Sequence, residues 1–440
     1  MGGGIAGLAA AWHLRDLDVI VLEAADRVGG RIRSEARGEV WLNFGAHVFS
    51  GPDSATGRLI AATGVAAAQV EGRLAAVALG DRVVASGMVE TYPFRLPLPL
   101  RSRVSLVRAG IALRLAVRRY AAVAAERPGE SAAERQQRML EFLDDRSFSD
   151  FIGALPADVD AIFRATLNRS SGAPEELAAG YGIGYFHLVW NRSTGLSRNI
   201  LGGSSTLIDA LAGGNADRIL TGAEATAVVP TEQDIAVRYR RDGVEQEVSA
   251  RHAIVATPSF VAREIIHGLP AETADALGAM RYGPYVVGAV LTGETHAMPW
   301  DDLYALATPR RSFGMLFNTA NVLRSRGGAR QGGSLMVYAA AGQARTLDGL
   351  DDDEVRERFL ADLYSLYPEA RAVVSDVVIQ RWERGLPYAA VGRGRLQAAL
   401  TRPLGRIHLA GDYLGTWYTE TACQTAEAAA RAIALDRRQG

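Results

Sequence analysis

Residues 1–24 read MGGGIAGLAAAWHLRDLDVIVLEA, and this stretch decides the fold. It contains Gly2-x-Gly4-x-x-Gly7, then apolar residues at helical spacing, then a strand-like run that ends at Glu23. The first glycine permits a tight turn, the second lets the backbone approach a pyrophosphate, and the third lets a helix pack close to a sheet. The free N–H groups at the start of that helix then point at phosphate oxygens. The stretch predicts a dinucleotide-binding turn that opens an α/β fold.

Two features of this stretch sharpen the prediction. Glu23 stands where an acidic side chain meets a ribose hydroxyl, and a carboxylate there disfavours the 2′-phosphate of NADP. The pattern also calls for a strand before the glycine loop, yet only Met1 precedes it. Three explanations are open for the absent strand. Val- and Ile-rich residues lie upstream in the native gene, another segment takes the place of the strand in the sheet, or the chain as given is unstable.

A second glycine-rich segment follows the acidic residue. Arg27-x-Gly29-Gly30-Arg31 adds backbone N–H groups, and arginine meets phosphate in a two-pronged geometry. The stretch WLNFGAHVFS then places Gly45 and Ala46 where small residues let a flat ring approach, with His47 beside them. His47 could reach the same ligand or could have a structural role alone.

The other end of the chain repeats the strand–turn–helix arrangement. In RIHLAGDYLGTWYTETACQTAEAAARAIA, Gly411-Asp412 ends a short strand, and an alanine-rich helix begins near Glu420. Thr419 is the expected N-cap of this helix. A helix N-terminus favours negative charge, so this turn can also face an anionic part of a ligand. We expect the two turns to converge on one ligand.

Together these segments resemble the flavin-containing amine oxidase superfamily, which includes monoamine and polyamine oxidases, protoporphyrinogen oxidases and phytoene desaturases. The resemblance implies that Asp412 binds the ribitol chain of FAD and that residues 419–422 lie beside flavin N1 and O2. Cys423 lies inside the last helix and does not match the cysteine that tethers FAD in monoamine oxidases, so non-covalent FAD is expected. The cofactor residues expected on this basis are Gly2, Gly4, Ile5, Ala6, Gly7, Glu23, Ala24, Arg27, Gly29, Gly30, Arg31, Gly45, Ala46, His47, Ala225, Ala256, Gly411, Asp412, Thr419, Thr421 and Ala422.

The positions of these segments predict an interleaved layout. Residues 1–50, 200–260 and 375–440 should form a Rossmann-like FAD-binding domain of the α/β class. Residues 51–199 and 261–374 should form a substrate domain of α+β character, with a mixed sheet and helices. Strand-like runs at YVVGAVLTG and GSLMVYAAAG suit a sheet under a substrate cavity.

Composition limits the partners of the chain. A net charge of −1 over 440 residues gives no general attraction to nucleic acid, so the expected partner is a small-molecule substrate. One cysteine excludes an internal disulfide and fits a cytoplasmic location. No apolar run predicts a transmembrane helix, and the histidines show no metal-ligand spacing. The arginine-rich residues 103–127 read as a helix with a solvated face or with peripheral membrane contact; the oligomeric state stays open.

All 48 basic residues are arginine, so the chain contains no lysine. Many amine oxidases of the superfamily hold a water at flavin N5 with a lysine. Because this chain lacks that lysine, the assignment to amine substrates is weaker. Dehydrogenation of a C–C or C–N bond, as in protoporphyrinogen oxidases or desaturases, is an alternative. The resemblance places Tyr418 at one wall of an aromatic cage, so it is expected to face the substrate. It also places Trp382 and Tyr388 in a segment similar to Trp-x-x-x-x-Pro-Tyr of protoporphyrinogen oxidases; these two could face the substrate as well, or could be core residues with no function.

We therefore expect an FAD-dependent oxidase or dehydrogenase that takes a hydride from a C–N or C–C bond of a small organic substrate. Two alternatives remain at this point. FGAHVFS loosely resembles the UDP-galactopyranose mutases, which would indicate a flavin-dependent mutase or isomerase without net redox chemistry. The chain could also bind FAD without catalysis.

Overall fold

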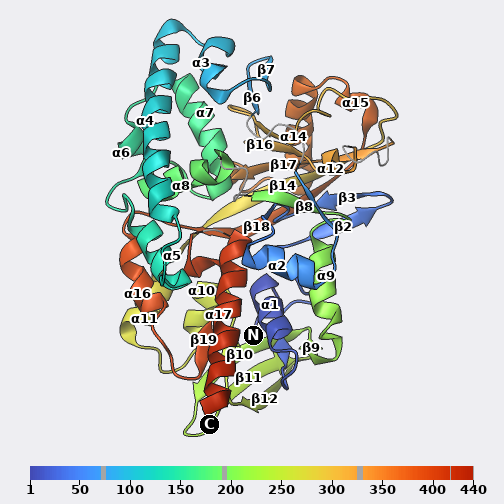
Figure 1. The fold of residues 1–440 in the computed structure, drawn as a ribbon. Coiled ribbons are helices and arrows are strands. Elements are labelled where there is room, and N and C mark those ends of the chain that lie inside the picture. The colour runs from blue at the N-terminus through green and yellow to red at the C-terminus, as the bar shows by residue number, and fades with distance from the viewer. Residues whose placement is uncertain (71–75, 191–195, 325–330, 417, 440) are drawn as a thin grey trace.

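The computed structural model of the chain describes residues 1–70, 76–190, 196–324, 331–416 and 418–439. Both termini lie toward one end of the molecule, long strands cross its middle, and a group of helices rises along one side (Figure 1). The structure is mixed α/β, as the sequence predicts. It consists of short parallel strand pairs near the termini, one large sheet, and a helical group.

The glycine pattern forms the expected strand-and-helix unit near the N-terminus. Helix α1 (Ile5–His13) follows the turn, and strand β1 (Val21–Leu22) ends just before Glu23. Two short parallel pairs are formed by β1 with β9 (Ile219–Leu220) and by β13 (Ala253–Val255) with β19 (Ile407–Leu409).

Met1 and Gly2 lie between these two pairs. The Met1 amine donates to the Ile254 carbonyl at 2.8 Å, and the Ala256 N–H donates to the Met1 carbonyl at 2.8 Å. On the other side, the Gly2 N–H donates to the Leu22 carbonyl at 2.8 Å. Among the described strands, β1 pairs only with β9 and β13 only with β19. Met1 therefore stands where the sequence calls for a strand.

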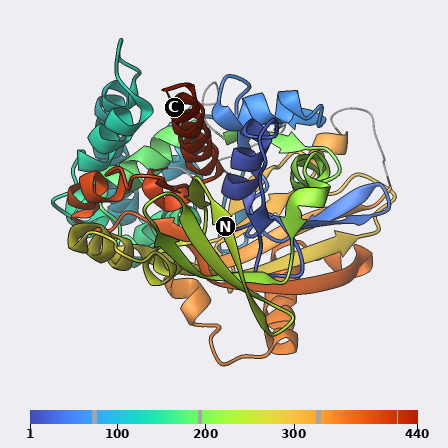
Figure 2. The same ribbon diagram turned by 90° about the horizontal axis from the view of Figure 1, so that it is seen from below.

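The last helix returns to the first. Helix α17 (Tyr418–Gln439) lies beside α1 in both ribbon views (Figures 1 and 2). Ala422, Cys423 and Ala426 on α17 share a buried core with Ile5 and Leu8 on α1. Small side chains on both helices allow this close packing, so the two ends of the sequence become neighbours.

Smaller sheets and helices surround the parallel pairs. The strands are β2 (Ser34–Arg37) with β3 (Val40–Asn43), β10 (Ala223–Pro230) with β11 (Ile235–Arg241) and β12 (Val244–Ala250), and β4 (Phe49–Ser50) with β8 (Leu196–Ile200) and β5 (Ala67–Gln69). The helices are α2 (Ala55–Ala62), α9 (Ser205–Gly213), α10 (Ser259–Ile265), α11 (Ala271–Ala279) and α16 (Gln397–Leu400).

The large sheet has the strand order β18-β14-β17-β16-β15-β6-β7. Its strands are β6 (Ala76–Leu79), β7 (Arg82–Val84), β14 (Arg281–Thr292), β15 (Ala305–Ala307), β16 (Met315–Asn318), β17 (Gly333–Ala340) and β18 (Val374–Tyr388). The two runs predicted as strands form β14 and β17. Phe359 of α14 (Asp352–Leu366) packs into the core on one side of this sheet, together with residues of α13 (Gly342–Arg345) and α15 (Ala370–Val373). The short helix α12 (Asn321–Arg324) contributes Val322 to a different core.

The helical group contains α3 (Tyr92–Arg95), α4 (Leu100–Ala124), α5 (Ala132–Glu141), α6 (Phe148–Ile152), α7 (Ala157–Leu167) and α8 (Ala179–Trp190). The arginine-rich helix predicted from the sequence is α4. Tyr120, Phe148 and Tyr185 anchor the core of this group. No helix in the described residues combines the length and the apolar composition needed to cross a bilayer.

The predicted domain segments stay a prediction. Strand β18 lies in the segment 375–440 except for its first residue, yet it pairs with β14 in the large sheet. The C-terminal segment therefore contributes to both parts of the molecule, and the covalent chain passes between them several times.

Candidate active site

A cavity of about 810 Å³ lies where the N-terminal turn, α17 and the large sheet meet. This volume is in the usual range for ligand pockets. The cavity wall brings together most of the residues expected from the sequence: Gly2, Gly4, Ile5, Ala6, Glu23, Ala24, Arg27, Gly29, Gly30, Arg31, Gly45, Ala46, His47, Ala225, Ala256, Trp382, Gly411, Asp412, Tyr418, Thr419 and Ala422. Gly7, Thr421 and Tyr388 are not part of this wall.

The three glycines of the first turn meet different steric limits. Gly2 has a φ of +90°, and a Cβ there would lie 2.7 Å from the Ala256 carbonyl oxygen. A Cβ on Gly7 would lie 1.9 Å from the Gly2 carbonyl oxygen, so Gly7 is needed for the packing of α1 rather than for the cavity wall. A Cβ on Gly4 would meet no protein atom within 4 Å. Gly4 therefore faces open cavity space.

The N-terminus of α1 is suited to an anion. Gly4 is its N-cap, and no side chain caps the first turn. The first N–H groups of a helix have no partner within the helix, and together they attract negative charge. A pyrophosphate against Gly4 would meet these N–H groups and no side chain.

Glu23 is held in place beside this turn. One carboxylate oxygen accepts from the Gly3 N–H at 2.6 Å, and the other accepts from the Ala25 N–H at 2.8 Å. Each carboxylate oxygen can accept a further hydrogen bond. Glu23 can therefore take a ribose hydroxyl as the sequence pattern predicts.

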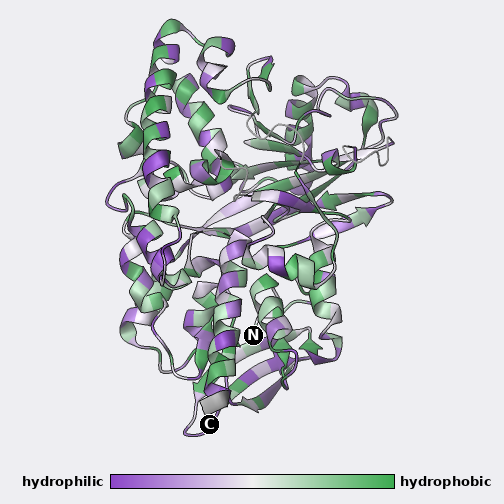
Figure 3. Cartoon of the chain, viewed as in Figure 1, coloured by the Kyte–Doolittle hydropathy of each residue, from purple (hydrophilic) through white to green (hydrophobic). Residues whose placement is uncertain are grey.

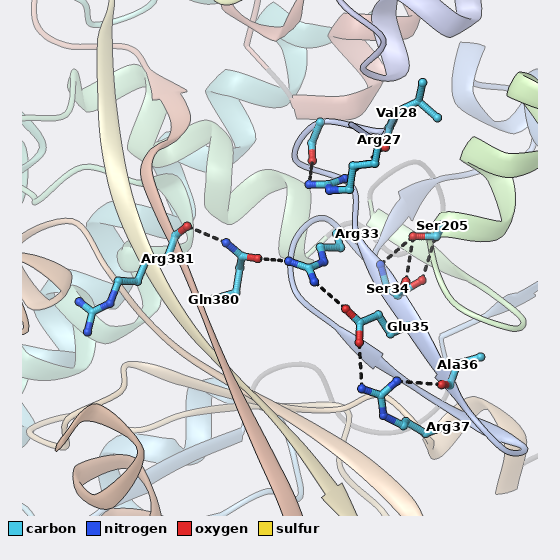
Figure 4. A network of polar contacts seen from close by, with 11 residues as sticks. Arg27, Val28, Arg33, Ser34, Glu35, Ala36, Arg37, Ser205, Gln380 and Arg381 are labelled. Atoms are coloured by element: carbon cyan, nitrogen blue, oxygen red, sulfur yellow. Dashed lines mark hydrogen bonds and ion pairs between the residues drawn. The ribbon is translucent and has the colours of Figure 1, made fainter. Parts of the chain in front are cut away.

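The second glycine segment packs on the first. Gly29 and Gly30 have φ values of +102° and +55°, and the Gly29 N–H donates to the Gly3 carbonyl at 2.8 Å. Arg27 donates within its own loop, to the carbonyls of Val28 at 3.2 Å and Gly30 at 2.9 Å (Figure 4). These bonds stabilise a loop that lines the cavity next to α1.

A polar network ties this N-terminal region to the large sheet. Glu35 accepts from Arg33 at 2.6 Å and from Arg37 at 2.8 Å, and Arg33 reaches Gln380 on β18 at 2.5 Å (Figure 4). Burial alone would raise the pKa of Glu35, but hydrogen bonds from the two arginines lower it. Ser34 and Ser205 bond each other and link β2 to α9 (Figure 4).

Arg31 and Asp412 join the two ends of the sequence at the cavity. The two guanidinium nitrogens of Arg31 lie 2.8 and 3.0 Å from the two oxygens of Asp412. This two-pronged pair fixes the orientation of the Asp412 carboxylate. Asp412 still lines the cavity, where the family resemblance expects it to meet the ribitol chain.

The C-terminal turn differs from expectation in one respect. Helix α17 begins at Tyr418, so Thr419 lies inside the first turn, and the prediction that Thr419 is the N-cap was wrong. The reason is the backbone at Tyr418, whose φ of +37° is uncommon for a residue with a side chain and places the bend one residue earlier. Thr419 and Ala422 line the cavity, whereas Thr421 is buried.

Of the three aromatic residues considered for the substrate side, two reach the cavity. The Tyr418 hydroxyl donates to the Arg169 carbonyl at 3.2 Å, and the Trp382 indole N–H donates to the Phe44 carbonyl at 2.6 Å. Tyr388 instead joins the core of the helical group. The pairing of β14 with β18 shifts register between Trp382 and Tyr388, so a regular alternation along β18 does not relate the two side chains.

His47 lies in the cavity wall as a neutral ring. Its Nδ1 lies 3.1 Å from the Gly45 carbonyl oxygen, and its ring meets Phe317 edge to face at 4.8 Å. Burial lowers the pKa of His47 to about 4. Its Nε2 has no hydrogen-bond partner among the described residues.

Sequence reasoning missed Arg169, which also lines the cavity. It stands in the stretch TLNRSSGAPEE, which matches no catalytic or binding motif. Its importance depends on tertiary neighbours that no local pattern indicates. Within the described residues, no cluster of three or more His, Cys, Asp or Glu side chains is arranged for a metal ion.

Comparisons with known proteins identify the family and the fold of the chain. The family model described as flavin containing amine oxidoreductase matches residues 5–434. Among solved structures, wild-type putrescine oxidase bound to putrescine and cyclohexylamine oxidase from Brevibacterium oxydans IH-35A are each similar with a TM-score of 0.78 and 19% identity. In both comparisons 99% of this chain and 98% of the other chain are covered, which shows a common fold.

The family match decides among the functions that the sequence left open. It confirms the expected flavin-dependent oxidoreductase, and nothing in the comparisons favours a mutase or a non-catalytic protein. The chain is a flavin-dependent oxidoreductase and belongs to the family of flavin-containing amine oxidoreductases.

Proposed function

We propose that the cavity holds FAD without a covalent bond and that the enzyme oxidises a C–N bond of an amine substrate. The observation that carries this proposal is the convergence of two distant turns on one cavity. Gly4 and the N-terminus of α1 form one part of its wall, and Asp412 and the start of α17 form another. A ligand that spans both must be long, with an anionic middle and a polar chain, as FAD is.

The residues then have separable tasks. The α1 N-terminus receives the pyrophosphate, Glu23 receives a ribose hydroxyl, and the Arg31–Asp412 pair receives the ribitol chain. The start of α17 would bring a helix N-terminus to the flavin pyrimidine, where it would favour the negative charge of a reduced ring. When bound, the flavin accepts a hydride equivalent from the substrate carbon.

The protein groups around the reaction supply orientation and a dry environment rather than acid–base chemistry. Tyr418 and Trp382 can form walls for the substrate, and aromatic walls lower the local polarity. His47 is neutral at physiological pH because burial lowers its pKa to about 4, so it can accept a hydrogen bond at Nε2. The chain holds no lysine for a water at the flavin.

The position of Cys423 supports a dissociable cofactor. Its thiol is buried in the core that α17 shares with α1 and α2, and burial raises its pKa to about 12. Cys423 does not line the cavity, and a protonated buried thiol is a poor nucleophile. Amines are favoured over C–C substrates because the family and both solved neighbours are named for amine oxidation. A cytoplasmic location stays a prediction from the sequence.

Anaerobic spectroscopy tests the proposal. The purified enzyme, reconstituted with FAD, should lose the visible absorbance of oxidised flavin when a reactive amine is added, and oxygen should restore it. Denaturation with acid should release FAD into solution. A mutase would need prior chemical reduction and would bleach no flavin in turnover, and a binding protein would respond to no amine. Flavin that stays with the precipitated protein would contradict the non-covalent assignment.

A further inference from the structure

One part of the cavity wall contains a charged side chain that is not among the residues expected to bind the cofactor. We call this part the substrate end; its residues come from the turn η2 (Asn168–Ser170), α8 and the large sheet: Arg169, Tyr185, Tyr285, Phe317, Met336 and Tyr338. All except Arg169 are uncharged. Arg169 is only partly buried, and it lines the cavity, so its accessible surface faces the space available to a ligand.

Aromatic groups surround the guanidinium of Arg169. It lies 5.0 Å from the ring centre of Phe317 and 5.6 Å from that of Tyr185. Tyrosine hydroxyls and the neutral His47 ring are the groups that interact with its charge, and no carboxylate of the described residues pairs with it. Arginine stays protonated in proteins, and a charge removed from water without a counter-charge is costly. Cation–π contacts compensate for only part of this cost.

The structure holds Arg169 firmly in this position. Its carbonyl accepts hydrogen bonds from Tyr285 at 2.9 Å and from Tyr418 at 3.2 Å. The neighbouring Asn168 side chain donates to Gln343 at 2.9 Å, and the Ser171 hydroxyl donates to the Leu386 carbonyl at 3.0 Å. These bonds fix the backbone that carries the guanidinium, so less ordering of this segment is needed when a ligand binds, which increases affinity.

The carboxylates of the cavity lie elsewhere. Asp412 is paired with Arg31, and Glu23 is held by backbone N–H groups of the cofactor turn. Glu224 and Glu264 belong to β10 and α10, whose buried residues share a core with Leu22 just before Glu23, whereas Phe317 belongs to a different core. The substrate end therefore presents one fixed positive charge. It would repel a substrate with a second ammonium group and attract one with an anion.

We propose that the substrate is an amine that also carries a carboxylate, as an amino acid does, and that Arg169 pairs with this carboxylate. The inference rests on the proposed amine oxidation and narrows its substrate class. Guanidinium and carboxylate match each other in a two-pronged geometry, which also orients the substrate. Arg169 is thus a specificity-determining residue, distinct from the groups that hold the cofactor.

Matched substrate pairs test this inference on the flavin-loaded enzyme. Phenylalanine and leucine, each as both enantiomers, are compared with 2-phenylethylamine and 3-methylbutylamine, which lack only the carboxylate. Anaerobic flavin reduction gives a rate and an apparent dissociation constant for each compound. Calorimetry with 3-phenylpropionate, which has the carboxylate but no amine, measures the charge pairing without turnover.

We expect the wild type to prefer the amino acids over the matched amines. Arg169→Met should weaken binding of amino acids and of 3-phenylpropionate by about 10- to 100-fold, the usual worth of hydrogen bonds to a charged group. Its binding of the plain amines should stay the same or improve. Arg169→Gln gives a second measurement with a polar side chain at the same position. Arg345→Met removes a surface arginine that is paired with Glu176, and as the control it should leave ligand binding and flavin reduction unchanged.

The outcomes separate the two proposals. A wild type that reduces flavin only with plain amines, or an Arg169 variant with unchanged preference and unchanged 3-phenylpropionate binding, overturns the inference and leaves amine oxidation intact. Arg169-dependent binding of 3-phenylpropionate without flavin reduction by any compound supports the charge pairing and contradicts the proposed oxidation.

Discussion

At the scale of single residues, burial in the cavity wall keeps the His47 ring neutral. This should affect how the free energy of unfolding depends on pH. Burial lowers the pKa of His47 to about 4 in the folded protein, whereas an unfolded histidine titrates near about 6.5. Below about pH 6.5 the unfolded chain binds a proton that the folded chain does not, so the free energy of unfolding falls as pH falls toward about 4.

We expect this residue to account for about 1 to 2 kcal/mol of the stability lost between about pH 7 and about pH 5. His47→Gln should therefore flatten the pH dependence, measured by urea unfolding of the cofactor-free protein at both pH values. His296→Gln, at an exposed position, is the matched control and should keep the wild-type slope. Equal slopes for the wild type and His47→Gln would show that the ring is solvated in solution.

At the scale of elements, α4 presents an unusual surface. Its solvent face alternates Arg101, Val104, Arg108, Ile111 and Leu115, and the aliphatic members are more than half exposed. Figure 3 shows hydrophobic and hydrophilic residues mixed along the whole helix. A face that combines exposed apolar groups with arginine can lie on an anionic lipid surface, where each basic residue contributes about 1 kcal/mol.

We therefore expect the enzyme to co-sediment with vesicles that contain phosphatidylserine and to stay in solution with phosphatidylcholine vesicles alone. The double substitution Ile111→Asp with Leu115→Asp should abolish this binding while flavin content stays unchanged. Val244→Asp, an equally exposed apolar position on β12, serves as the control and should bind as the wild type. Equal sedimentation with both kinds of vesicle, or with neither, would indicate that the face is simply solvated.

Local signals in the sequence predicted many elements but not their assembly. Helix α1 and strands β14 and β17 follow from the periodicity of apolar residues. The large sheet does not, because β6 joins it by pairing with β15, more than two hundred residues further along the chain, and β7 is attached to the sheet through β6 alone among the described strands. Likewise the cofactor turns were predictable from glycine spacing, whereas Arg169 gains its role only from Tyr185 and Phe317 across the fold.

At the scale of the whole molecule, the central claim is that two turns from opposite ends of the chain hold one ligand. Arg31 and Asp412 are 381 positions apart and form an ion pair at the cavity. A ligand that binds only the folded state raises stability by RT ln(1 + [L]/Kd), about 2.7 kcal/mol at a hundredfold excess over Kd. Fragments of the cofactor can therefore report which turn each fragment uses.

ADP contains the pyrophosphate but neither the ribitol chain nor the flavin ring, so it should stabilise the cofactor-free enzyme through the N-terminal turn alone. Gly4→Ala should weaken both ADP and FAD, because the added Cβ fills cavity space while meeting no protein atom within 4 Å, and Gly4 has an ordinary φ of −73°. Asp412→Asn should leave the ADP-induced rise in unfolding temperature intact and reduce only the rise caused by FAD. Equal losses for ADP and FAD in Asp412→Asn would mean that the two turns do not divide one cofactor between them, since a residue at the ribitol chain has no contact with ADP to lose.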